Sequence, residues 1–105
     1  MPATDLLAVA GGKSFEGCYA FQATVDPANH TTLTAVNTVV TVPSGITLLS
    51  TDTIVAIPPP AFEAGMVVQS CVYASATTMT LRTGNPTAGA IDPASGTWTF
   101  LVFRD

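Results

Sequence analysis

The chain has 105 residues, of which 48% are hydrophobic and only 10% are charged, and its formal net charge is −4. This length allows one domain with one core, and an ordinary soluble domain carries charge on roughly 25% of its residues. With three Lys and Arg residues in all, the chain lacks the clustered cations that bind a nucleic-acid backbone or an anionic membrane. The composition predicts a surface of Thr, Ser, Asn, Gln and Ala that loses its water at low cost, so we expect an assembly in which other subunits cover it.

The beginning of the chain predicts an arm and then a strand. Residues 1–14 end in Gly11-Gly12 and are expected to form an extended N-terminal arm, which either reaches a neighbouring subunit or stays a disordered terminus. Asp5 stands where a secretion signal carries positive charge, and no apolar run reaches the roughly 18 residues of a membrane span. From Phe15 the pattern has the strand period of two. The face expected to be buried consists of Phe15, Gly17, Tyr19, Phe21, Ala23 and Val25.

The middle of the chain predicts three further strands. The β-branched run 32–42 ends at a turn over 43–45 and is typical of a strand. A short strand is expected over 53–57, followed by Pro58-Pro59-Pro60, which cannot donate to a β-ladder and predicts a stiff, extended connector. Residues 66–74 predict the next strand.

The last third predicts two more strands. Residues 77–83 alternate, with Met79 and Leu81 inward. The final strand is apolar on both sides, which predicts a central or doubly buried strand; its two rows are Trp98, Phe100 and Val102, and Thr99, Leu101 and Phe103. The fold class is therefore predicted as all-β: a compact β-sandwich or small β-barrel of about six to seven antiparallel strands, with residues 15–105 as a single β domain.

His30 is the only histidine in the sequence and lies in the predicted loop 26–31. A serine-type triad would use His30 as the base and Asp26 or Asp52 as the group that orients it. No Gly-x-Ser-x-Gly nucleophile elbow is present. We therefore expect His30 to be an exposed loop side chain, and we assign no catalytic residue.

The carboxylates and cysteines do not form a recognisable metal site. One His and two distant Cys match no zinc ligand set, and the turn carboxylates lack the Asp-x-Asp-x-Asp spacing of a calcium loop. The calcium candidates are Asp26, Asp52, Glu63 and Asp92; the turn aspartates among them are instead expected to cap local backbone. We expect no metal and no cofactor.

Three residue sets leave alternatives open. Glu16 and Glu63 could serve as the acid and base of a glycosidase, but nothing in the sequence places them together. Cys18 and Cys71 could form a disulfide, although buried thiols are favoured. An aromatic set could form a platform that stacks on sugar, but its members lie inside strand patterns, which favours core packing; the set is Tyr19, Tyr73 and Trp98.

The stretch Arg82–Arg104, with Asn85-Pro86, Asp92-Pro93 and the run that begins at Trp98, resembles the end of small structural proteins encoded by tailed bacteriophages. The likeness covers about residues 33–105 and includes segments with a similar rhythm, namely 39–43, 52–55 and 58–65. It implies a virion component of the head-decoration, or cement, type and transfers no residue roles.

What this resemblance implies agrees with the low charge. A decoration protein is made in the host cytoplasm, binds the major capsid protein on the outside of the assembled head and associates with itself, with a trimer favoured over a dimer. We expect this function, without enzyme activity and without nucleic-acid or membrane partners. The alternatives are a fibre, spike or adhesin module that binds host glycan, and a small hydrolase.

Overall fold

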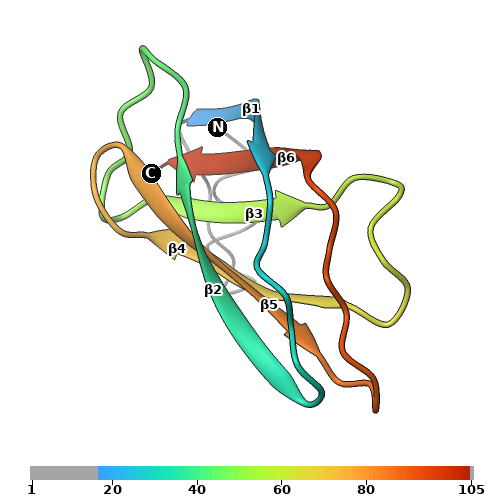
Figure 1. The fold of residues 1–105 in the computed structure, drawn as a ribbon. Helices are drawn as coiled ribbons and strands as arrows, with labels where there is room; N and C mark the ends of the chain where they lie inside the picture. The colour runs from blue at the N-terminus through green and yellow to red at the C-terminus, as the bar shows by residue number, and fades with distance from the viewer. Residues whose placement is uncertain (1–16, 105) are drawn as a thin grey trace, which may run out of the picture.

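The computed structural model describes residues 17–104, which form six strands and no helix (Figure 1). All strand pairings are antiparallel, which confirms the all-β prediction. The predicted arm 1–14 lies outside the described residues, as do Phe15 and Glu16. The strands are β1 (Gly17–Val25), β2 (Thr34–Thr41), β3 (Thr53–Ile57), β4 (Val67–Tyr73), β5 (Thr78–Asn85) and β6 (Gly96–Arg104).

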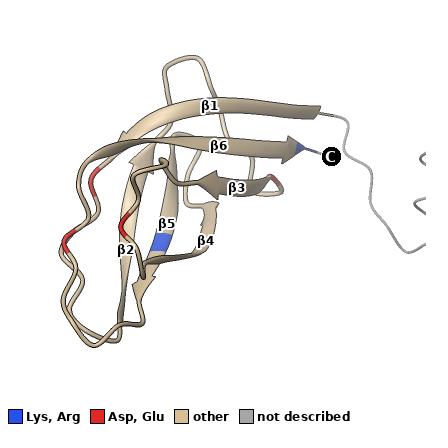
Figure 2. Ribbon diagram, turned by 90° about the vertical axis from the view of Figure 1, so that its right-hand side faces the viewer, with Lys and Arg blue, Asp and Glu red and all other residues tan. Residues whose placement is uncertain are grey.

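The strands form two three-stranded sheets that pack against each other as a sandwich. The first sheet has the order β1-β6-β3 and the second has the order β2-β5-β4. Strands of the first sheet run across those of the second (Figures 1 and 2), as in orthogonal sheet packing. The chain passes from one sheet to the other at every connection except the β4–β5 hairpin. Segments distant in sequence therefore meet at the core and at the ends of the sandwich.

Strand β6 is the centre of the first sheet, as its sequence predicts. It pairs with β1 on one side and β3 on the other. The inward row, which consists of Trp98, Phe100 and Val102, is almost fully buried. The outward side chains of Leu101 and Phe103 are only half-buried. The strand is therefore central, and its second face is covered only in part.

Aromatic rings fill the middle of the core. The ring of Phe21 stacks on Phe100 with centroids 5.5 Å apart, and the ring of Phe62 meets Trp98 edge-on at 5.1 Å. Phe62 follows the three prolines and lies in a turn. Its amide donates to the Pro59 carbonyl oxygen at 3.0 Å. The connector thus carries an aromatic side chain over the edge of the core, where offset and edge-to-face ring pairs are favourable.

Trp98→Ala tests this core. We expect it to lower the free energy of unfolding by about 3–5 kcal/mol, because it leaves a large cavity between the sheets. Urea denaturation followed by circular dichroism measures the loss. Val39→Ala is the control, since Val39 is 70% exposed. An equal effect of the two substitutions would show that Trp98 does not support the core.

Candidate functional site

His30 is fully buried, so the prediction of an exposed loop histidine is wrong. Its backbone forms an isolated bridge with Ile91. The His30 nitrogen lies 2.8 Å from the Ile91 carbonyl oxygen, and the Ile91 nitrogen lies 2.9 Å from the His30 carbonyl oxygen. This pairing holds the ring beneath the end of β5, where Nε2 lies 2.7 Å from Thr83 Oγ1. Nδ1 lies 2.7 Å from the Ala28 carbonyl oxygen. Because a carbonyl oxygen only accepts, Nδ1 donates, and in the neutral ring Nε2 accepts from the Thr83 hydroxyl.

Asn85 extends this buried polar group into the neighbouring loops. Its amide donates to the carbonyl oxygens of Gly89 at 2.8 Å, His30 at 3.3 Å and Thr31 at 3.4 Å. Its carbonyl oxygen accepts from the amide and the hydroxyl of Thr87 at 3.0 and 2.6 Å. Both ring nitrogens of His30 are bonded to groups other than an aspartate or a serine. The cluster joins two loops and does not have the geometry of a catalytic triad.

Asp52 and Arg104 form a second polar cluster, which we call the second tether. It lies at the C-terminal end of β6. The guanidinium donates to both carboxylate oxygens, at 2.9 Å to Oδ1 and 2.7 Å to Oδ2. It also donates to the Tyr19 hydroxyl and the Thr47 carbonyl, each at 2.9 Å. Asp52 Oδ2 accepts from the Leu49 amide at 2.9 Å, so the predicted backbone cap is confirmed. Hydrogen bonds from Arg104 hold the pKa of Asp52 below its ordinary value.

The remaining loop carboxylates do not converge. Glu63 accepts from the Ala94 amide at 3.0 Å, which links two distant loops. Asp26 and Asp92 are exposed. Glu16 lies outside the described residues, so the structure does not test the pairing with Glu63.

The cysteines lie on different sheets and are both free thiols. Cys71 is buried as predicted; burial raises its pKa to about 11, and its sulfur lies 3.7 Å from Met79 Sδ. Cys18 is exposed, and its prediction as a buried thiol is wrong. The alternation of β1 predicts that Cys18 is exposed, because Cys18 falls in the row opposite Tyr19 and Phe21.

The three candidate aromatics for sugar stacking pack with the core. Trp98 is fully buried, and Tyr19 and Tyr73 are partly buried against the same cluster. They do not form an exposed platform, which confirms the prediction of core packing. Stacking on a sugar requires a ring face that is open to solvent.

Among residues 17–104, the side chains on the outer side of the first sheet carry no charge, and we call this surface the uncharged face. Its middle rows follow from the register: Ala20 and Val55 flank Leu101, and Gln22 and Ile57 flank Thr99. Val55 and Ile57 are 43% and 42% exposed. Figure 2 shows no coloured charge along β1 and β3 or along β6 before its last residue. The face comprises Cys18, Ala20, Gln22, Thr24, Thr53, Val55, Ile57, Thr97, Thr99, Leu101 and Phe103.

Neither a metal site, a membrane-spanning helix nor a known relative points to another functional site within residues 17–104. Among residues 17–104, no three His, Cys, Asp or Glu side chains gather closely enough to hold a metal ion. The same part of the chain has no helix of the length and hydropathy needed to cross a bilayer. Comparisons with family models, with curated proteins and with solved structures find no match to this chain. The uncharged face is the candidate functional surface on its geometry alone.

Thr83→Val tests the buried polar cluster. The change keeps the side-chain shape but leaves His30 Nε2 without its partner, which costs about 1–3 kcal/mol for a buried group. Chemical denaturation measures the loss. Thr80→Val, on the outer side of the same strand, is the control and should change stability by no more than about 0.5 kcal/mol. Equal stability of the two variants would contradict a structural role for the His30–Thr83 bond.

Asp52→Asn tests the second tether through pH. A lowered pKa in the folded state means that the unfolded chain binds more protons, so Asp52 stabilises the fold at pH values above its unfolded pKa of about 3.9. This stability is lost as the pH falls from there through the folded pKa. Wild type should exceed Asp52→Asn in stability at pH 6, and the difference should shrink by pH 2.5, as measured by urea denaturation at each pH. Asp26→Asn, in an exposed loop, should keep the wild-type response; a pH-independent difference for Asp52→Asn would refute the ion pair's contribution.

Proposed function

We propose that this chain is a non-enzymatic structural protein of the capsid-decoration type, which binds the major capsid protein on the outside of a phage head. The observation that carries the proposal is the uncharged face. A partner that covers this face removes water from apolar, hydroxyl and amide groups, and from no ionised side chain. The cores of protein interfaces are depleted of charge for the same reason.

The arrangement of the uncharged face supports binding to a protein surface. Its middle contains the half-exposed side chains of Val55, Ile57 and Leu101, and Thr and Gln side chains lie around them. These residues stand on three hydrogen-bonded strands, so little backbone entropy is lost when a partner binds. Apolar side chains surrounded by polar ones are the usual composition of a specific interface.

Several features favour this role over the alternatives. The likeness of residues 33–105 to small tailed-phage structural proteins supports a virion component. A glycan-binding module would use exposed aromatic rings, whereas Trp98 is buried. A hydrolase would need polar groups free to act on a substrate, whereas His30 and Asp52 are bonded within the fold. We therefore propose decoration, with stabilisation of the capsid through protein contacts alone.

Self-association belongs to the same proposal. A stable contact buries on the order of 1,000 Å² or more in total, and closed symmetry is the rule for homo-oligomers. A trimer at a symmetry position of the capsid would present several copies of the uncharged face to neighbouring capsid subunits. The multivalent arrangement would raise the affinity beyond that of a single copy.

Val55→Lys tests the proposed function. It places an ammonium in the middle of the uncharged face, where covering it requires the loss of its hydration. We expect binding to capsids assembled from the major capsid protein of the same genome to weaken about tenfold or more, which corresponds to about 1.4 kcal/mol. Co-sedimentation measures the binding, and light scattering after size-exclusion chromatography measures the oligomer.

Ser44→Lys is the matched control, because it adds the same charge to an exposed turn in the connection from β2 to β3. This variant should bind capsids as wild type does. Circular dichroism and urea denaturation check that both variants fold. If a folded Val55→Lys protein binds capsids with wild-type affinity, or if wild type does not bind them, the proposed function is refuted.

A further inference from the structure

The outer side of the second sheet carries one charged residue, Arg82, on the central strand β5. Its guanidinium is held by side chains from the strands on either side. Nε donates to Gln69 Oε1 at 2.9 Å, and Nη1 donates to Asn37 Oδ1 at 3.0 Å. Gln69 stands at the bulge of β4, between Val68 and Ser70. The guanidinium is therefore fixed over the sheet by two neutral amides.

Arg82 differs in this respect from Arg104, which is bonded to both oxygens of Asp52. Within residues 17–104, no carboxylate pairs with Arg82. The amides use part of its hydrogen-bonding capacity and leave N–H groups on both terminal nitrogens. Two such groups form the fork that binds a carboxylate in a bidentate manner. Arg82 thus has a fixed side-chain position and, within residues 17–104, no carboxylate that pairs with its charge.

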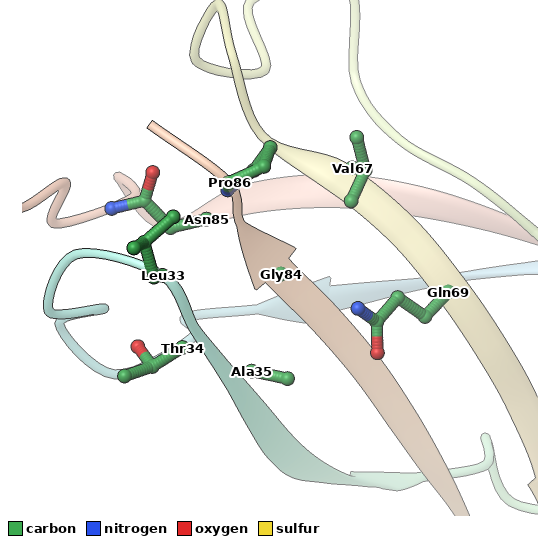
Figure 3. Close-up of a pocket in the computed structure, with 8 residues that line it drawn as sticks. All are labelled: Leu33, Thr34, Ala35, Val67, Gln69, Gly84, Asn85 and Pro86. Carbon is green, nitrogen blue, oxygen red and sulfur yellow. The ribbon is translucent and has the colours of Figure 1, made fainter. Parts of the chain in front are cut away.

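A groove of about 300 Å³ lies at Gly84, two residues along β5 from Arg82 (Figure 3). Gly84, which is buried, lies at its base, and the Gln69 side chain from β4 reaches over it, so that a Cβ on Gly84 would lie 2.7 Å from Gln69 Nε2. Gln69 thus both lines the groove and positions Arg82. The apolar walls are formed by Leu33, Ala35, Val67 and Pro86.

Leu33, at one end of the groove, has an unusual conformation. Its φ is 56°, in the left-handed region, and its side chain is 76% exposed. A large γ-branched residue rarely adopts this backbone conformation, and strain of this kind collects at binding sites. The conformation presents an apolar side chain beside the groove, where a ligand can cover it.

The distance between Arg82 and Gly84 matches the distance between side chains on one side of an extended polypeptide. Arg82 and Gly84 are two residues apart on one strand and face the same side, which separates them by about 6.6–6.8 Å. Side chains on one side of an extended peptide repeat at the same distance. A small anion would bind the guanidinium but would leave the apolar groove empty. A peptide fills both.

We propose that Arg82 and the groove over Gly84 form a second binding site, which takes an extended segment of a partner protein. The segment carries an Asp or Glu that pairs with the guanidinium, and an apolar residue two positions away that enters the groove. Charge complementarity sets the acidic position, and the groove sets the apolar one. The site lies on the sheet opposite the uncharged face and does not depend on the proposed capsid contact.

A displayed library of random heptapeptides tests the site, with the purified full chain as the labelled target. Wild type should select peptides with an Asp or Glu and an apolar residue two positions away. Arg82→Gln should fold, because exposed polar replacements have small effects on stability, and should lose the acidic preference. For a selected peptide, Arg82→Gln in the protein or Asp→Asn in the peptide should weaken binding about tenfold by fluorescence polarisation, and the two changes together should cost little more than either alone.

Gly84→Ala tests the groove together with the Gln69 amide, which also positions Arg82. Its Cβ would lie 2.7 Å from Gln69 Nε2 and 3.4 Å from Val67 Cγ2, so the Gln69 amide must move and the groove is filled. The variant should lose the apolar preference, whereas Gly89→Ala, which meets nothing within 4 Å, should select as wild type does. Val55→Lys should also select as wild type, which separates this site from the uncharged face. Selection of no peptide by wild type, or the same acidic preference in Arg82→Gln, overturns the proposal.

Discussion

The burial of one side of β6 against the second sheet holds the two sheets together and sets the register of the first sheet. Trp98, Phe100 and Val102 fill the space between the sheets, while the backbone of β6 pairs with β1 and β3. A slip of one residue would turn this row outward and bring Thr97 and Thr99 into the core. The same constraint therefore fixes which residues form the uncharged face.

The polar residues with the chemistry for catalysis are used to hold the ends of the sandwich together. The chain crosses between the sheets repeatedly, so its connections need attachment points. His30 and Asn85 attach one pair of loops, and the pair of Asp52 and Arg104 attaches the segment before β3 to the end of β6. These groups are bonded to one another, and both of our proposals therefore rest on the outer faces of the sheets.

The two faces differ in what they offer to a partner. The uncharged face can be covered without desolvating an ion, but it contains no charge to specify an orientation. The outer face of the second sheet has one cation in a fixed position beside a groove, which favours a ligand with a defined direction and sequence. Under the two proposals, one face supplies contact area and the other selects a particular segment, so one small domain could connect two partners.

The strands and their inward rows could be predicted from the sequence, because the alternation of a strand is a local property of neighbouring residues. The rows through Phe21, Met79 and Trp98 all face inward as predicted. The burial of His30 could not be predicted in this way, since a loop residue is covered by whichever distant segment pairs with it. The same holds for the site at Arg82, whose supporting amides come from a bulge in β4 and from β2. Such contacts depend on register between distant strands, and no spacing within one segment encodes them.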